Sequence, residues 1–259
     1  MTDKRRVLVR AVAGEFLVTF LFLFVVMSVG VNFRRANPTE ADATLGGIST
    51  GFTAVALIYS FADVSGAHFN PAVTMGTIVT GKVSVKKGLW FIGIQLSASI
   101  MATLWLQVVF PPHRGFNASE IAVVDFGDKV VIGRAFAMEA TLTFILVYVI
   151  FATAFETVDT NNKVLVKPVA DGAQKSATVN PNGAGREVTQ DASVGKNLTI
   201  YTTSANSKSG FAPLAIGLTL GFLCFLGGSV SGGAFNPARV FGPAIVTGNW
   251  NNHWVYWIG

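Results

Sequence analysis

Residues 65–73 read Ser-Gly-Ala-His-Phe-Asn-Pro-Ala-Val, and residues 231–239 read Ser-Gly-Gly-Ala-Phe-Asn-Pro-Ala-Arg. The two stretches lie 166 residues apart, and six of their nine positions are identical. Each follows an apolar segment and opens a short run that is compatible with a helix, at residues 71–80 and 237–247. The chain therefore contains an internal repeat.

The Asn-Pro pair in each copy predicts the start of a helix. Asn is a favoured N-cap, and Pro at the first helical position lacks an N–H group that would have no partner there. Asn70 and Asn236 should each begin a helix much shorter than the ~20 residues needed to cross a bilayer. Because irregular backbone at membrane depth must be buried in protein or line water, paired short helices indicate a site near the membrane midplane.

The composition indicates a protein with several membrane spans. Of its 259 residues, 51% are hydrophobic and 13% are charged, and the mean hydropathy is +0.52. Five apolar segments are long enough to cross a ~30 Å hydrocarbon core. They cover residues 11–31, 46–62, 88–110, 135–155 and 211–230. Within them only Glu15 and Glu139 carry a formal charge, and an intramembrane carboxylate predicts a functional site.

The net charge of +5 follows the pattern of membrane orientation and gives no sign of nucleic-acid binding. Four basic side chains lie within residues 4–10, before the first predicted span, and three lie within residues 82–87, between the second and third spans. Positively charged loops stay in the cytoplasm. The N-terminus and this loop should therefore be cytoplasmic, and residues 111–133 should be extracellular.

Two further features concern the location of the chain. Asn117 begins an Asn-Ala-Ser triplet in the predicted extracellular segment, which makes it a candidate for N-glycosylation. The leader at residues 1–10 is too polar for the apolar core of a signal peptide, so the first span should act as an uncleaved insertion signal. The plasma membrane is the default location for such a chain.

The repeat makes the whole of residues 1–259 one domain, with halves at about residues 8–110 and 134–259. Each half should contain three spans and one re-entrant half-helix, and a half with three spans inverts its successor across the membrane. The sequence therefore predicts an all-α membrane protein with an inverted repeat. The sixth span begins within residues 253–259, where the sequence stops, so we expect this span to be truncated.

The second half carries an insertion. Glu15 precedes Asn70 by 55 residues, whereas Glu139 precedes Asn236 by 97 residues. The extra residues fall in residues 157–209, which are rich in Gly, Asn, Ser, Thr and Lys and show no sustained periodicity. This composition is typical of a surface loop rather than a separate domain. Its position after the fourth span predicts that the loop is cytoplasmic.

These features together resemble the aquaporins of the major intrinsic protein family. The resemblance rests on the paired Asn-Pro-Ala boxes, the Ser-Gly-Ala-His before the first, the arginine after the second, the two glutamates, Gln95 and the aromatic start of the sixth span. It covers the chain outside residues 157–209. It implies a passive, bidirectional channel for water across the lipid bilayer, assembled as a homotetramer, with no enzyme activity, no cofactor and no metal.

The resemblance assigns the pore centre to the two boxes. It places the side-chain amides of Asn70 and Asn236 where they donate hydrogen bonds to the oxygen of a passing water. Each half-helix N-terminus adds roughly +0.5 charge there, which disfavours cations and protons. The box positions that support these helices are Pro71, Ala72, Pro237 and Ala238.

The resemblance also implies a selectivity filter. Arg239 matches the filter arginine of the family, and a fixed positive charge at a constriction is an electrostatic barrier. The other filter positions fall at Thr50, Cys224 and Gly233. Strict water channels usually carry an aromatic residue and a histidine at the first two of these, so we expect a wider constriction here. Val240, where glycerol channels usually carry Asp, resembles the water-channel branch, so water is the first substrate, and glycerol, urea, ammonia and hydrogen peroxide remain alternatives.

Other residues are candidates for supporting roles. Glu15 and Glu139 resemble buried braces that accept hydrogen bonds from the backbone of the re-entrant loops, with Gln95 beside them, and a proton relay is the alternative. His68 either lines the cytoplasmic half of the pore, where it could sense pH, or is a structural histidine. Cys224 is either a target for mercurials and oxidants or a small packing residue.

The insertion at residues 157–209 raises the hypothesis of gating. A cytoplasmic loop of this length could fold over the inner pore mouth, and phosphorylation at a residue such as Tyr201 could release it, because a dianionic group can reorganise a loop. The alternative is a solvated loop without a gating role.

Other classes of function compete with a water channel. One is a junctional or scaffolding membrane protein with a closed pore. An ion-coupled secondary transporter also uses inverted repeats and broken helices, but it would need acidic residues at the midplane, where this sequence offers two asparagines. An enzyme is not supported, because the sequence contains no metal-ligand cluster, nucleophile elbow or phosphate-binding loop.

Overall fold

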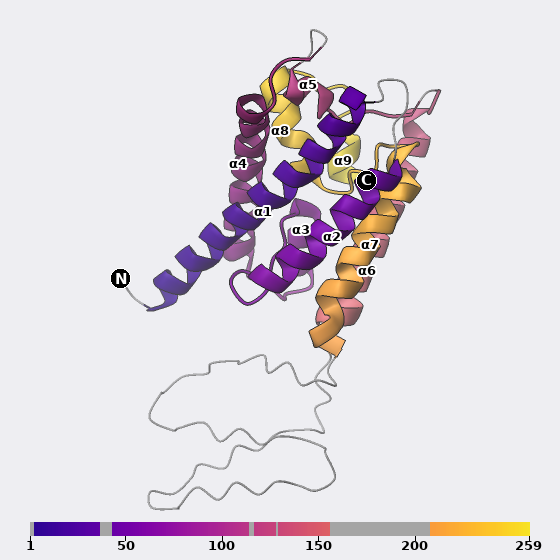
Figure 1. The fold of residues 1–259 in the computed structure, drawn as a ribbon. Coiled ribbons are helices and arrows are strands. Elements are labelled where there is room, and N and C mark those ends of the chain that lie inside the picture. The colour runs from indigo at the N-terminus through magenta and orange to yellow at the C-terminus, as the bar shows by residue number, and fades with distance from the viewer. Residues whose placement is uncertain (1–2, 37–42, 114–116, 128, 156–207) are drawn as a thin grey trace, which may run out of the picture. The chain divides into compact units, whose positions relative to one another are not determined.

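The computed structural model describes residues 3–36, 43–113, 117–127, 129–155 and 208–259. These residues form helices joined by loops and contain no strand, which confirms the all-α prediction. The helices shown in Figure 1 are α1 (Asp3–Ala36), α2 (Ala43–Phe61), α3 (Pro71–Val79), α4 (Val85–Val109), α5 (Ala118–Ile121), α6 (Ile132–Ala154), α7 (Lys208–Gly228), α8 (Pro237–Thr247) and α9 (Val255–Ile258).

Five of these helices, α1, α2, α4, α6 and α7, are long and apolar enough to cross a membrane. They coincide with the five spans predicted from the sequence. α1 extends beyond its predicted span at both ends and has 34 residues. α7 begins at Lys208, two residues inside the segment 157–209 that we predicted as a loop. The rest of that segment, residues 157–207, lies outside the described residues.

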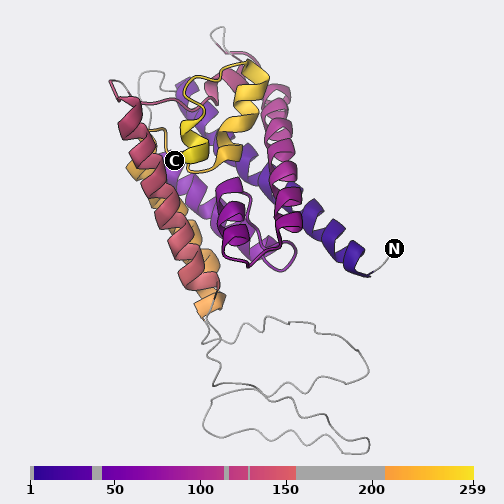
Figure 2. The same cartoon turned by 180° about the vertical axis from the view of Figure 1, so that it is seen from behind.

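The two short helices α3 and α8 are the predicted half-helices, and each begins at the proline of an Asn-Pro-Ala box. They have 9 and 11 residues, too few for the ~20 of a membrane span. In Figures 1 and 2, α8 lies in the upper part of the helix group and α3 in the lower part. Both contact α4, and they contact each other.

The order of long and short helices repeats along the chain. The first half runs α1, α2, α3, α4, and the second runs α6, α7, α8, α9, with the single turn of α5 between them. α9 lies where the sixth span was predicted to begin. The division into two similar halves stays a prediction, with which this element order agrees.

Glycines allow α2 and α7, one from each half, to cross closely. A Cβ atom added to Gly217 would lie 2.9 Å from the carbonyl oxygen of Gly51 and 2.3 Å from the side chain of Val55. A Cβ atom added to Gly221 would lie 3.0 Å from the carbonyl oxygen of Gly47. Small residues let helix backbones approach in this way in membrane proteins. The crossing joins the two halves of the repeat.

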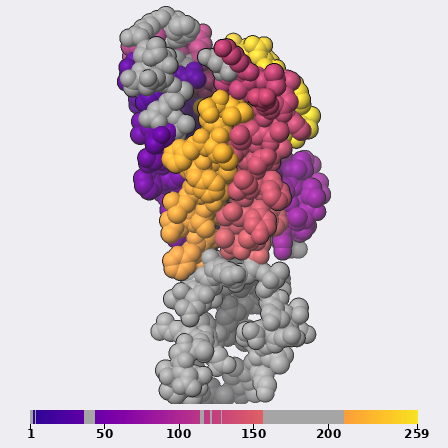
Figure 3. Space-filling view, turned by 90° about the vertical axis from the view of Figure 1, so that its right-hand side faces the viewer, coloured from indigo at the N-terminus to yellow at the C-terminus, as the bar shows by residue number. Residues whose placement is uncertain are grey.

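The spans divide their apolar side chains between a core and the outside. Figure 3 shows α6 and α7 side by side along one face. Leu142 of α6 and Leu223 of α7 are fully buried in the main core. Phe144 and Phe211, on the same two helices, are 69% and 63% exposed. Large exposed apolar side chains on spans of this length fit contact with lipid, as expected of a multi-pass membrane protein.

Candidate functional site

Each asparagine of the two boxes caps its half-helix. Asn70 has extended backbone angles, and its side-chain oxygen accepts a hydrogen bond from the N–H of Ala72 at 2.8 Å. Asn236 has almost the same angles and accepts from the N–H of Ala238 at 3.0 Å. Proline is the first residue of both helices. The helix starts are therefore those that the Asn-Pro pairs predict.

The two asparagines also bind each other's loop. The Nδ2 atom of Asn70 donates to the carbonyl oxygen of Phe235 at 2.8 Å, and Nδ2 of Asn236 donates to the carbonyl oxygen of Phe69 at 3.0 Å. An amide nitrogen carries two hydrogens, and within the described part of the chain each Nδ2 uses only one of them in this way. The N-termini of two helices, each with roughly +0.5 charge, thus meet at one point.

Strained backbone aims the two carbonyl groups at these asparagines. Phe69 and Phe235 directly precede the asparagines and have φ angles of +36° and +29°. Residues with side chains rarely adopt this left-handed region, and such strain costs on the order of 1–3 kcal/mol and persists only where the surroundings hold it in place. The surroundings of these two residues must therefore constrain both loops.

Glu15 of α1 provides this constraint for the first loop. Its carboxylate accepts hydrogen bonds from the backbone N–H groups of His68 and Phe69 at 2.9 and 3.0 Å. It also accepts from the side chains of Ser65 and Gln95 at 2.7 and 2.9 Å. Glu15 has no exposed surface. A buried carboxylate is tolerated only when such donors surround it, and here they come from the loop and from α4.

Glu139 of α6 repeats the arrangement in the second loop. Its carboxylate accepts from the N–H groups of Ala234 and Phe235 at 3.2 and 2.6 Å, and from the hydroxyl of Ser231. Glu139 is also fully buried. The two glutamates therefore contact equivalent backbone groups in the two halves, which is the geometry that the predicted brace role requires.

The four predicted filter residues lie around one cavity. It is lined by Thr50 of α2, Cys224 of α7, Gly233 of the loop before α8, and Asn236 and Arg239. Its volume is about 30 Å³, and a buried water needs ~10–15 Å³. Nη1 of Arg239 donates to the carbonyl oxygen of Ala122 at 2.8 Å, which holds the guanidinium group. The cavity is a narrow, water-sized space beside one of the two central asparagines.

The sequence matches a known protein family over most of its length. The family model of the major intrinsic proteins matches residues 3–179 and 193–259. The chain belongs to the major intrinsic protein family. Members of this family are passive channels and not enzymes, so the chain is a transmembrane channel for water or small solutes.

Individual relatives agree with this assignment. The chain is similar to Aquaporin-B from Dictyostelium discoideum, with 55% identity over 258 residues that cover 98% of this chain and 79% of the relative. It is 33% identical over 257 residues to an aquaporin from Enterocytozoon bieneusi (strain H348), covering 99% and 91% of the two chains. The X-ray structure of the aquaglyceroporin from Plasmodium falciparum matches with a TM-score of 0.65 and 20% identity, covering 97% and 88%. That last likeness shows the fold alone.

Two residues of α1 that were not predicted from the sequence also line the cavity around the four predicted filter residues. Phe22 and Val26 complete its apolar wall, and the ring of Phe22 lies 4.5 Å from that of Phe69. Phe22 and Val26 lie on the same helix as Glu15, about two and three turns after it. Residues three and four apart share a helix face, so the position of Glu15 is the signal that could have identified them.

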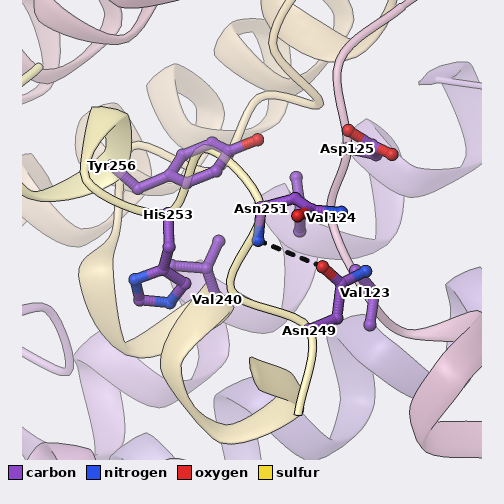
Figure 4. A pocket seen from close by; sticks show the side chains of 8 residues that line it. All are labelled: Val123, Val124, Asp125, Val240, Asn249, Asn251, His253 and Tyr256. Carbon is purple, nitrogen blue, oxygen red and sulfur yellow. Dashed lines mark hydrogen bonds between the residues drawn. The ribbon is translucent and has the colours of Figure 1, made fainter. Parts of the chain in front are cut away.

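A smaller pocket lies next to α8, on the side of Val240 (Figure 4). Its volume is about 10 Å³, which leaves room for one water at most. The backbone N–H of Asn251 donates to Oδ1 of Asn249 at 3.1 Å within its wall. Tyr256, which also lines it, donates from its hydroxyl to the carbonyl oxygen of Ser231 at 2.9 Å. This pocket is lined by residues of both α8 and α9 and has no room for a larger solute.

His68 lies within the first braced loop. Its Nδ1 atom is 3.1 Å from the hydroxyl oxygen of Thr74, and its ring meets the ring of Phe91 edge-on at 5.4 Å. The side chain is 8% exposed. Gln95 donates to both Thr74 and Glu15, at 3.0 and 2.9 Å. His68 is thus connected to the glutamate brace, and its predicted lining or pH-sensing role stays a hypothesis.

The remaining predicted residues lie away from the cavity or outside the described part. Asn117 is exposed at the start of α5, and its backbone N–H donates to the carboxylate of Glu120 at 2.7 Å. The hydroxyl of Ser119, the third residue of the triplet, accepts from Nε2 of Gln107 at 2.8 Å. Tyr201 lies outside the described residues. Within the described part of the chain, no group of three or more His, Cys, Asp or Glu could hold a metal ion.

Proposed function

We propose that the channel conducts water passively in both directions and excludes protons and ions. The observation that carries this proposal is the meeting of Asn70 and Asn236, each of which donates to the loop of the other half. The second hydrogen of each amide can donate to the oxygen of a water at that point. An oxygen that accepts two such bonds has no lone pair left for a proton from the neighbouring water.

Electrostatics supports exclusion of cations. The two half-helix N-termini place roughly half a positive charge each at the same point. Arg239 adds a full positive charge at the proposed filter cavity. It follows Asn236 by only three residues, so this charge lies close to the place where the two asparagines meet. A fixed arginine and converging helix dipoles form an electrostatic barrier to cations in a narrow pore.

Vesicle shrinkage tests the proposal. The protein is reconstituted into lipid vesicles, and water efflux after an osmotic step is followed by stopped-flow light scattering. We expect fast flux that neither saturates nor depends on an ion gradient. Flux equal to that of protein-free vesicles would contradict a water channel, and saturable flux driven by an ion gradient would support the secondary transporter instead.

A second candidate substrate class is small neutral solutes such as glycerol, urea, ammonia and hydrogen peroxide. The observation in its favour is the presence of Thr50 and Cys224 at the filter cavity, because neither is as large as an aromatic side chain or a histidine. Swelling of the same vesicles in an isosmotic glycerol or urea gradient measures this permeability directly. Swelling at the protein-free rate would limit the channel to water.

We further propose, from the family resemblance and the charge pattern, a homotetramer in the plasma membrane with a cytoplasmic N-terminus. Native mass spectrometry tests the oligomeric state, and protease access to an N-terminal tag on intact cells tests the orientation. A shift in mass after glycosidase treatment would show that Asn117 is modified. No shift would remove it as a glycosylation site.

Gating by the insertion at residues 157–209 is part of the same proposal and is supported by the length and composition of that segment. Deleting residues 159–207 should raise water flux per channel, because the lid over the inner mouth would be gone. If Tyr201 releases the lid on phosphorylation, a negatively charged replacement at that position should raise the flux as well. Unchanged flux per folded channel after the deletion would refute the lid.

A further inference from the structure

Ser99 of α4 contacts the filter helix α8 from a position that the proposed function does not use. Its side chain is completely buried. Its hydroxyl donates to the carbonyl oxygen of Ala238 and accepts from the backbone N–H of Gly242 at 2.9 Å. A serine hydroxyl can donate and accept at once. One side chain of α4 therefore holds two successive turns of α8.

These two backbone groups lie on either side of Arg239. Ala238 directly precedes the arginine, and Gly242 follows it by three residues. The N–H of Arg239 itself donates to the carbonyl oxygen of Asn236 at 2.9 Å. Because α8 has only 11 residues, contacts at these points determine where the base of the arginine side chain lies.

The close approach of α4 and α8 makes the hydroxyl contact specific. A Cβ atom added to Gly242 would lie 2.4 Å from the carbonyl oxygen of Ser99 and 2.5 Å from its hydroxyl oxygen. Ala98 and Ala102 of α4, on either side of Ser99, are small and fully buried. The backbone of Ser99 therefore packs directly against Gly242, and the two hydrogen bonds of its hydroxyl fix the register between the helices.

We propose that Ser99 is a positioning residue for the selectivity filter. It fixes the base of Arg239 through α8, while the carbonyl oxygen of Ala122 holds the guanidinium end at 2.8 Å. The arginine is thereby held at both ends across the cavity that Thr50 and Cys224 also line. This inference rests on the filter role that is proposed for Arg239.

The consequence of losing the hydroxyl is a change in selectivity. In Ser99→Ala, the N–H of Gly242 loses its acceptor on α4 and α8 becomes free to shift or rotate. Glycerol is larger than water, so it responds more strongly to the position of the guanidinium group. We expect the ratio of glycerol to water permeability to rise by about fivefold, the factor that a change of about 1 kcal/mol in the difference between the two permeation barriers produces.

The experiment measures both permeabilities in vesicles that contain equal amounts of folded protein. Ser97→Ala is the matched control, because Ser97 lies two residues earlier on α4, is exposed, and bonds only within its own helix, to the carbonyl oxygen of Gly93 at 2.9 Å. The ratio of glycerol to water permeability of Ser97→Ala should equal that of the wild type. If Ser99→Ala does not insert, Ser99→Cys takes its place, since a thiol keeps the shape and is a weak donor and acceptor.

The two proposals fail in different ways. Wild-type vesicles without water flux would overturn the proposed conduction of water. Wild-type flux together with an unchanged glycerol-to-water ratio in the Ser99 variant would overturn the positioning role. The same holds if both permeabilities fall in proportion, because that result would assign the hydroxyl to folding alone.

Discussion

Glu139→Ala should strongly destabilise the channel, because it removes the acceptor for the second braced loop. The carboxylate accepts the N–H groups of Ala234 and Phe235 at 3.2 and 2.6 Å in a site closed to solvent. A buried N–H left without an acceptor costs about 1–3 kcal/mol, so two of them cost about 2–6 kcal/mol. The hydroxyl of Ser231 can rotate to another acceptor, so it adds little.

Glu139→Gln separates the hydrogen bonds from the charge. The amide has the same shape and keeps one acceptor oxygen, but its NH₂ group faces one of the two backbone N–H groups. One lost bond costs about 1–3 kcal/mol. Part of this cost is offset, because a neutral amide is less expensive to bury than a carboxylate. The stability of the glutamine variant should therefore lie between that of the wild type and that of Glu139→Ala.

Thermal unfolding in detergent, followed by tryptophan fluorescence, measures these differences. At about 2–4 °C per kcal/mol for a chain of this size, Glu139→Ala should lower Tm by about 4 °C or more. Asp63→Ala is the control, because Asp63 is exposed and surface changes usually stay within about 0.5 kcal/mol. A Tm of Glu139→Ala within the range of this control would show that Glu139 does not brace the loop.

Three further changes have defined outcomes. Gly217→Ala should lower Tm, because its Cβ would lie 2.3 Å from a side chain of α2 and overpacking costs about 1–3 kcal/mol; Gly46→Ala, with nothing within 4 Å, is its control. Asn236→Ala should lower Tm, because the helix loses a cap worth about 1 kcal/mol. It should also raise the proton permeability of vesicles, measured with a pH-sensitive dye inside them. A variant whose vesicles stay impermeable to protons would contradict the central role of the amide. Thr50→Phe combined with Cys224→His should reduce glycerol swelling more than water flux, and an equal reduction would remove these residues from the filter.

Local rules were sufficient for the elements of the fold. The Asn-Pro pairs predicted that helices start at residues 71 and 237, and α3 and α8 begin there. Apolar length predicted five spans, and five helices fit them. These properties depend on neighbours within a few residues, through capping, proline geometry and hydropathy, so they can be recognised in a single sequence. The end of the insertion was less well predicted, because Lys208 and Ser209 already belong to α7.

The sequence by itself determined that there are two half-helices, which residues begin them, and which two carboxylates lie in the spans. Only the tertiary structure decided that Asn70 binds the loop of Phe235, that Phe22 and Arg239 line one cavity, and that Ser99 bonds to α8. Ser99 and Gly242 are 143 positions apart, and nothing near either residue in the sequence indicates the other. Such contacts exist because whole helices pack against each other, and their spacing follows from the shapes of many side chains at once.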